Sequence, residues 1–355
     1  MVGLLDRYIG IQVIAGTMLA LALLLSVFSF LDFREDQDSV GQGNYTRARA
    51  VEHMLLTMPT RAFALFPPAA LIGTLLGLGA LASSRELIAM RAAGISQQRI
   101  ALSVMKAGAI LVILAIAVGE LVSPNTEQIA QTNRAEAMSK KQTLRTAYGY
   151  WVRDKNSFIN IRNIAKDGDL EDVYIYEFDA ARKLRTSTHA KRASHTGESW
   201  QLVDIVQSEL SDDGIQAHKI VKAEWHSPLL PDLVTTVRVS PESLSVFGLV
   251  KYIRYLRENG LASARFDVAL LNKFVFPLAT AVMIYLAVSI ILVRNSPMQV
   301  GQRIVIGALV GVGFHIIHNT SIRLGLVYDL SPIVTALLPT LVFAAGAMVL
   351  MRRTL

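Results

Sequence analysis

Six apolar runs, each close to the length that crosses a bilayer, restrict most strongly what this chain can fold into. A helix needs about 20 mostly apolar residues to span a membrane. The first run is too long for a signal-peptide core and lacks a cleavage site after it, so we expect it to be retained. We therefore predict six transmembrane helices, at residues 9–31, 61–83, 99–122, 270–293, 304–322 and 332–351.

The composition excludes several other classes of protein. Of 355 residues, 52% are hydrophobic and 18% are charged, which is too apolar for an average soluble domain and too charged for a chain that is membrane-embedded throughout. The net charge of +7 does not by itself indicate nucleic acid binding, because much of the basic charge lies beside apolar runs. With no cysteine, disulfides, cysteine-ligated zinc and thiol catalysis are excluded.

Basic residues near the ends of the runs predict the orientation of the chain. Short loops on the cytoplasmic side of a membrane protein carry an excess of Lys and Arg. One side carries Arg7, Arg85, Arg91, Arg99, Arg294, Arg303, Arg352 and Arg353, and the other carries Arg34, Arg47, Arg49 and Arg323. We therefore expect both termini and residues 84–98 in the cytoplasm, and the long polar segment on the exported side.

That polar segment, residues 125–264, has no long apolar run. Residues 125–141 are helix-prone and predict a continuation of the third helix into water. Short alternating segments then predict the strands of a sandwich or open barrel, at 149–161, 173–178, 200–209 and 233–239. Residues 242–259 predict an amphipathic helix with Leu244, Phe247, Leu249, Val250, Ile253 and Leu256 on one face.

The second run contains two kinds of helix-modifying residue. Pro67 and Pro68 would kink or restart the helix. Gly73, Gly77 and Gly79 form a small-residue stripe that lets another helix approach closely, although glycine is also simply tolerated in membrane helices.

A short polar stretch, residues 84–96, separates the second and third runs. Its apolar residues partly keep helical spacing, Gly94 can end a helix, and Ser96 can cap the next one. Two interpretations stay open from the residues alone: a charged loop that anchors the helices at the lipid headgroups, or a surface helix onto which a partner docks.

Catalytic motifs are missing. The sequence has no phosphate-binding G-x-x-x-x-G-K-[ST] loop, no H-E-x-x-H and no G-x-S-x-G. His315 and His318 could share a metal, but polar contacts between helices are the simpler interpretation. Arg34, Arg61 and Arg134 lie at the membrane boundary, where they could anchor the chain or bind lipid phosphates.

Taken together, several motifs resemble the LptF/LptG permease subunits of the lipopolysaccharide exporter. They are Leu4-Leu5-Asp6-Arg7-Tyr8-Ile9, Pro67 to Gly79, Glu86 to Gly94, Gly119-Glu120 with Pro124, Phe247 to Gly260, and Ser296-Pro297-Met298. The resemblance covers essentially the whole chain and is stronger to the LptG members.

The resemblance implies an inner-membrane permease that is not itself an enzyme and needs no cofactor. It implies a β-jelly-roll-like periplasmic domain between the third and fourth spans, which gives three parts: 1–124, 125–264 and 265–355. The implied partners are an LptF-like second permease, an LptB-like ATPase dimer, the bridge proteins LptC and LptA, and lipopolysaccharide as substrate.

The resemblance also implies roles for particular residues. The 84–96 stretch would be the coupling helix that docks on the ATPase, with Glu86 as its acidic contact and Arg85, Leu87, Met90, Arg91 and Gly94 around it. Arg134 would contact lipid phosphate, with Arg34 and Arg61 as further cations and Phe66, Leu71 and Phe314 on an apolar wall. Related chains are lysine-rich where residues 32–39 are mostly acidic here, so phosphate recognition would move to other residues or use divalent cations.

Three other functions are alternatives to this resemblance. Permeases for lipoprotein release or cell division share a similar coupling loop but usually have four spans, with the soluble domain after the first. An ATP-independent envelope scaffold would not bind an ATPase. A membrane enzyme would need a nucleophile–base pair, and no convincing pair is present.

Overall fold

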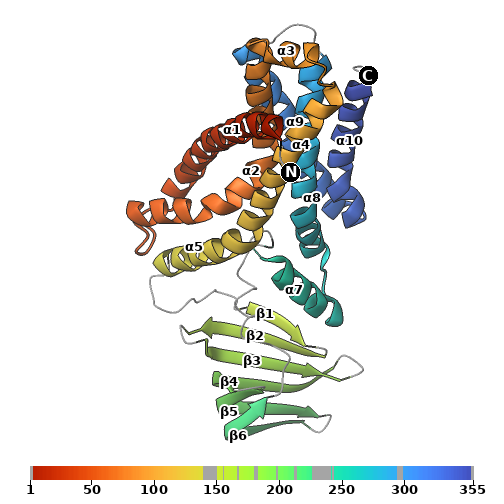
Figure 1. The fold of residues 1–355 in the computed structure, drawn as a ribbon. Helices are drawn as coiled ribbons and strands as arrows, with labels where there is room; N and C mark the ends of the chain where they lie inside the picture. The colour runs from red at the N-terminus through yellow and green to blue at the C-terminus, as the bar shows by residue number, and fades with distance from the viewer. Residues whose placement is uncertain are drawn as a thin grey trace.

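The computed structural model describes residues 3–138, 150–154, 156–165, 168–179, 183–196, 199–211, 214–225, 241, 244–293 and 299–352. A bundle of long helices stands at one end of the molecule and a β-sheet at the other (Figure 1). Within these residues, six helices are long and apolar enough to cross a membrane, and the sheet is inserted between the third and fourth of them. The predicted fold class, a six-helix membrane protein with an inserted all-β domain, is confirmed.

The membrane helices have the following bounds: α1 Leu4–Gln37, α2 Arg47–Ser83, α4 Gln97–Ala117, α8 Ala264–Val293, α9 Val300–Val327 and α10 Pro332–Arg352. A short helix, α3 Glu86–Ala92, connects α2 to α4. The apolar windows of α2 and α8 are 78% and 67% buried, whereas those of α1, α9 and α10 are only 22–28% buried. The bundle is therefore centred on α2 and α8, and the outer three helices present apolar surface outward.

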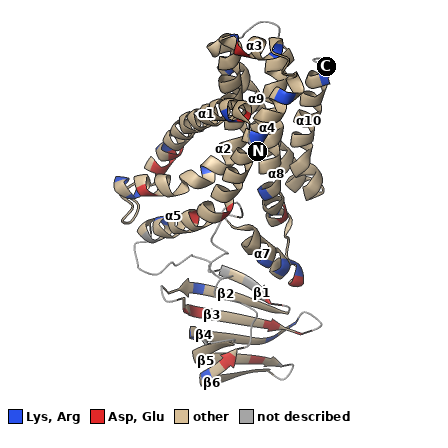
Figure 2. Ribbon diagram, in the orientation of Figure 1, with Lys and Arg blue, Asp and Glu red and all other residues tan. Residues whose placement is uncertain are grey.

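The third membrane helix continues beyond the bundle, as predicted. After α4, a π-helical turn at Val118–Val122 (η1) leads directly into α5, Ser123–Met138. Charged residues are sparse along the bundle and gather around α3, at the junction of α1 with α2, and around α7 (Figure 2).

The prolines of the second run do not restart its helix. α2 runs without interruption through Pro59, Pro67 and Pro68, so residues 47–60 and the predicted second span form one helix. Thr46 caps its start by accepting a hydrogen bond from the N–H of Arg49. Neighbouring helices sustain the proline-containing turns, since Pro67 and Pro68 are buried inside the bundle.

The glycine stripe of α2 is a packing surface, as expected. A Cβ on Gly73 would lie 2.2 Å from Cα of Thr17, and a Cβ on Gly77 would lie 2.4 Å from the carbonyl oxygen of Gln12. Gly16 faces Gly73 from α1 in the same way. The backbones of α1 and α2 therefore touch directly, which only residues without a side chain permit. Gly79 makes room instead for the side chain of Arg303 on α9.

The β domain is an antiparallel sheet whose six described strands run in chain order, with each strand paired to the next. Their bounds are β1 Tyr150–Asp154, β2 Ser157–Ile164, β3 Leu170–Phe178, β4 Leu184–Thr196, β5 Ser199–Ser211 and β6 Gly214–Trp225. A helix after the sheet, α7 Val246–Glu258, adds Tyr252, Tyr255 and Leu256 to the core of the sheet. The six described strands form a single sheet in this order, so the sandwich alternative is not seen among them, and the open-barrel alternative stays a prediction.

Several strand predictions need correction. The expected strand at 149–161 is a hairpin of β1 and β2, and β4 and β6 were not predicted, because polar residues on both faces hide their alternation. The strands expected at 173–178 and 200–209 are present as β3 and β5. The expected strand at 233–239 and the Ser296-Pro297-Met298 turn lie outside the described residues. On α7, Phe247 and Val250 are exposed, whereas Leu249, Ile253 and Leu256 are buried.

Candidate functional site

A cavity of about 630 Å³ lies where α1, α2, α5, α8 and α9 meet. The lining residues come from these five helices. α5 leaves the other helices at the end of the bundle nearer the sheet (Figure 1). Its apolar lining includes Phe63, Phe276, Ile322 and Leu326. Its charged lining consists of four carboxylates and four basic groups: Asp32, Glu35, Asp36 and Glu127, and Arg61, Arg134, Arg265 and Lys273.

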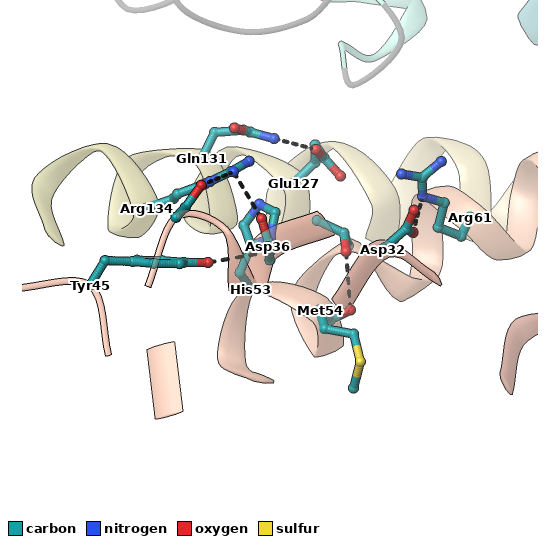
Figure 3. Close-up of polar contacts among 11 residues, drawn as sticks. Asp32, Asp36, Tyr45, His53, Met54, Arg61, Glu127, Gln131 and Arg134 are labelled. Atoms are coloured by element: carbon teal, nitrogen blue, oxygen red, sulfur yellow. Dashed lines mark hydrogen bonds and ion pairs between the residues drawn. The ribbon is translucent and has the colours of Figure 1, made fainter. Parts of the chain in front are cut away.

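Arg134, on α5, belongs to a polar cluster in this cavity whose central residue is Asp36 (Figure 3). Its Nη2 is 2.8 Å from Oδ1 of Asp36 and 3.5 Å from the hydroxyl of Ser39. The other oxygen of Asp36 is 2.7 Å from Nδ1 of His53 and accepts a hydrogen bond of 3.3 Å from Tyr45. Burial, and then the negative charge of Asp36, raise the pKa of Tyr45 to about 12, so its hydroxyl remains a donor at neutral pH.

A second cation of the cavity, Arg61, is paired at the same distance as Arg134 but is more exposed. Its Nε is 2.8 Å from Oδ2 of Asp32, and half of its side chain is exposed. Between the two arginines, Glu127 accepts hydrogen bonds from Thr60 at 2.9 Å and from Gln131 at 2.9 Å (Figure 3). The arginines therefore belong to one continuous polar surface formed by α1, α2 and α5.

The deepest cation of the cavity is Lys273, on α8. Its side chain is 4% exposed, and its Nζ donates to the carbonyl oxygen of Gly119 at 2.9 Å and lies 3.2 Å from Oε1 of Glu120. The other carboxylate oxygen of Glu120 accepts a hydrogen bond from the N–H of Val246, the first residue of α7. This pair thus joins α8, the π-helical turn and the helix that covers the sheet. Local π-helical turns often mark functional positions.

The connecting helix α3 has one face on the bundle and one in solvent. Leu87 is buried in the bundle core, with Met90 packed beside it. Ile88 and Arg91 are exposed, and Arg85 starts the helix with a left-handed backbone (φ 62°). A left-handed Gly94 (φ 88°) ends the segment, and Ser96 caps α4, as predicted.

Glu86 fixes α3 to the start of α1. It accepts a hydrogen bond of 2.6 Å from the hydroxyl of Tyr8 and another of 2.8 Å from Ser84. These donors lower the pKa of Glu86, so it is ionised at neutral pH. Nearby, Asp6 of α1 is held by Ser103 and Lys106 of α4, at 2.6 and 2.7 Å. The first two turns of α1 are therefore bound to both elements that follow α2.

Comparison with known proteins decides the family. Residues 7–353 match the family model described as lipopolysaccharide export system permease LptF/LptG. The chain is 37% identical over 346 residues to the lipopolysaccharide export system permease protein LptG of Escherichia coli (strain K12), covering 96% of both proteins. It is 36% identical over 345 residues to LptG of Haemophilus influenzae (strain Rd), covering 97% of this chain and 96% of that protein. The chain belongs to the LptF/LptG family.

In this LptF/LptG chain, the cations expected to bind lipid do not all reach the cavity. Arg61 and Arg134 line it, whereas Arg34 is exposed on α1 and is not part of the lining. The three residues expected on an apolar wall, Phe66, Leu71 and Phe314, are 2%, 0% and 2% exposed and do not line this cavity, so their contact with lipid stays a prediction. Phe63 and Phe276 supply the aromatic lining here.

Three further residues line the cavity that were not predicted from the sequence. Asp36, His53 and Lys273 all line the cavity. The sequence does point to Lys273, because it lies inside the apolar run 270–293, and a lysine in a membrane helix is energetically costly and commonly functional. His318, expected to make polar contacts, is buried between the rings of Phe276 and Phe314. Of the residues expected around Glu86 in the coupling segment, Leu87 and Met90 pack against the bundle core.

Proposed function

We propose that this chain is the permease subunit of an ATP-driven lipopolysaccharide exporter, which extracts lipopolysaccharide from the inner membrane and passes it to a periplasmic protein bridge. Membership of the LptF/LptG family supports this proposal. The observation that carries it is the cavity, where arginines and aromatic side chains lie together at the end of the membrane helices. A phosphorylated, multi-acyl lipid needs both kinds of contact.

The proposal includes an orientation and a division into parts. Basic residues near α3 and at the chain ends favour cytoplasmic termini and a periplasmic β domain. Residues 1–124 and 265–355 would form the membrane part, and residues 125–264 the periplasmic part. α3, within the 84–96 segment, would then face the cytoplasm, where ATP is hydrolysed by a separate subunit.

The proposed partners follow from the exposed surfaces and the family. The outward apolar faces of α1, α9 and α10 suit lipid or a second permease similar to LptF. The exposed face of α3 suits an ATPase dimer similar to LptB. The β domain suits edge pairing with bridge proteins similar to LptC and LptA, because antiparallel strands can be added to an open sheet edge.

Arg134→Gln tests the lipid site. We expect the assembled exporter carrying this variant to bind lipopolysaccharide about tenfold or more weakly, because one charge-assisted contact to phosphate is lost. Equilibrium binding in nanodiscs measures this, with dephosphorylated lipopolysaccharide as the comparison ligand. Arg254→Gln, the same change at an exposed position on α7 outside the cavity, is the matched control. Unchanged binding by the Arg134 variant would exclude this residue from the phosphate site.

Glu86→Ala tests the coupling helix. We expect the variant to remain folded but to recover several-fold less ATPase on affinity purification, because α3 loses both its charge and its contact with Tyr8. Tyr8→Phe is the control: it removes the same hydrogen bond but keeps the charge of Glu86. Lower recovery in both variants would assign the effect to the position of α3, and lower recovery in the Glu86 variant alone would assign it to the charge. Full ATPase recovery and full export with Glu86→Ala would contradict the proposed coupling role.

A further inference from the structure

The charges around the cavity are balanced before any ligand enters. Its lining holds four carboxylates and four Lys or Arg side chains, so the cavity carries no net charge when its histidines are neutral. Three of its cations are already paired with carboxylates: Arg134 with Asp36, Arg61 with Asp32, and Lys273 with Glu120, which lies outside the lining. A phosphate that binds Arg134 must therefore displace Asp36, and this carboxylate must then be stabilised by other groups, because an unpaired buried charge is costly.

Asp36 is the carboxylate that can release its cation at low cost. When Arg134 leaves, Nδ1 of His53 at 2.7 Å and the hydroxyl of Tyr45 at 3.3 Å still contact the other carboxylate oxygen. Asp32 has no comparable support, since Arg61 is its one polar side-chain contact among the described residues. Glu120 does have the N–H of Val246, but its cation Lys273 is 4% exposed and also bound to Gly119.

Arg134 is also suited to exchange the carboxylate of Asp36 for a phosphate. Its side chain is 31% exposed, and both of its hydrogen-bonding contacts within the described part of the chain use Nη2. Nη1 is thus available for an incoming oxygen before the bond to Asp36 breaks. A guanidinium group can bind a phosphate through two parallel hydrogen bonds, which favours completion of the exchange.

We propose that Asp36 is an internal competitor for the lipid phosphate at Arg134. The phosphate displaces the carboxylate when the lipid enters, and the carboxylate returns to Arg134 when the lipid leaves toward the β domain. Arg134 is paired with an anion throughout, so release of the lipid does not leave an uncompensated cation in the cavity. This inference rests on the proposed function and adds a residue that promotes release, while Arg134 itself promotes binding.

Asp36→Asn tests the inference in the assembled exporter. We expect the variant to bind lipopolysaccharide about tenfold more tightly, corresponding to ~1.4 kcal/mol, because the competing charge is gone. We expect it to release the lipid more slowly during ATP-driven transport. Binding of dephosphorylated lipopolysaccharide should not change, which also reports that the cavity is intact. Asp38→Asn, the same change two residues away at an exposed position outside the cavity lining, should leave both quantities unchanged.

Tyr45→Phe gives an opposite and smaller effect. It removes a hydrogen bond that holds the displaced carboxylate, so we expect lipopolysaccharide to bind about threefold more weakly. This variant decides the matter if Asp36→Asn does not fold. Equal or weaker lipopolysaccharide binding by a folded Asp36→Asn exporter would overturn the inference, and so would tighter binding by Tyr45→Phe. If binding by the unmodified exporter does not depend on phosphate, the proposed function itself fails, which is a separate outcome.

Discussion

Gly73→Ala is expected to destabilise the membrane bundle, although the same change normally stabilises a helix. Alanine favours a helix over glycine by about 1 kcal/mol. At Gly73, however, the new Cβ would lie 2.2 Å from Cα of Thr17 and 2.3 Å from its backbone nitrogen. Backbone atoms cannot rotate away, so α1 must separate from α2. Overpacking of this kind typically costs about 1–3 kcal/mol and sometimes more.

The apparent melting temperature of the purified chain in detergent measures the effect. Gly346→Ala is the matched control, because it lies inside α10 with no atom within 4 Å of the added Cβ. We expect the melting temperature to fall for Gly73→Ala and to stay the same or rise slightly for Gly346→Ala. A fall of equal size in both variants would show that close contact between α1 and α2 is not the cause.

Lys273→Met is expected to lower stability by about 3 kcal/mol, because it leaves Glu120 without its cation in a largely buried place. The loss should be greater than for Lys191→Met, which breaks an exposed pair with Asp204 on the sheet. Exposed pairs contribute little, typically less than about 1 kcal/mol. Thermal unfolding of the two variants side by side gives the comparison.

The double variant Lys273→Met, Glu120→Gln identifies the mechanism. Glutamine keeps an oxygen that can accept the hydrogen bond from the N–H of Val246 but removes the unpaired charge. We expect it to recover most of the lost stability. No recovery would mean that Lys273 acts through its packing and its bond to Gly119, and not through Glu120.

The long apolar runs predicted the membrane part of the fold, because length and hydropathy alone define a spanning helix. The glycine stripe predicted close helix contact, because residues without a side chain let two helix backbones approach each other. The polar strands β4 and β6 could not be found this way, since their polar residues occupy both faces and pairing with neighbours, not alternation, keeps them in the sheet. The restart that Pro67 and Pro68 suggested, as an alternative to a kink, does not occur, because the support for their helix comes from packing against other parts of the chain.

The candidate site depends even more on contacts between residues that are far apart in the sequence. Arg134 and Arg61 could be proposed from their positions near the ends of apolar runs. Their partners could not, because Asp36 meets His53 and Arg134 only after three separate helices pack together. Phe66 and Leu71 are buried in this chain, and sequence cannot tell which face of a uniformly apolar helix turns inward. On α3, likewise, sequence cannot show that Leu87 packs into the bundle core.

The glycine contact between α1 and α2 also gives α1 the geometry of an unequal lever. Tyr8 lies eight residues before Gly16, and Asp36 lies twenty residues after it, on the same continuous helix. At about 1.5 Å per residue, the two arms measure roughly 12 Å and 30 Å. If α1 pivots at this crossing, a displacement of about 1 Å at Tyr8 moves Asp36 by roughly 2.5 Å in the opposite direction. A movement of that size is comparable to the length of a hydrogen bond, so a small shift of α3 would be enough to carry Asp36 away from Arg134.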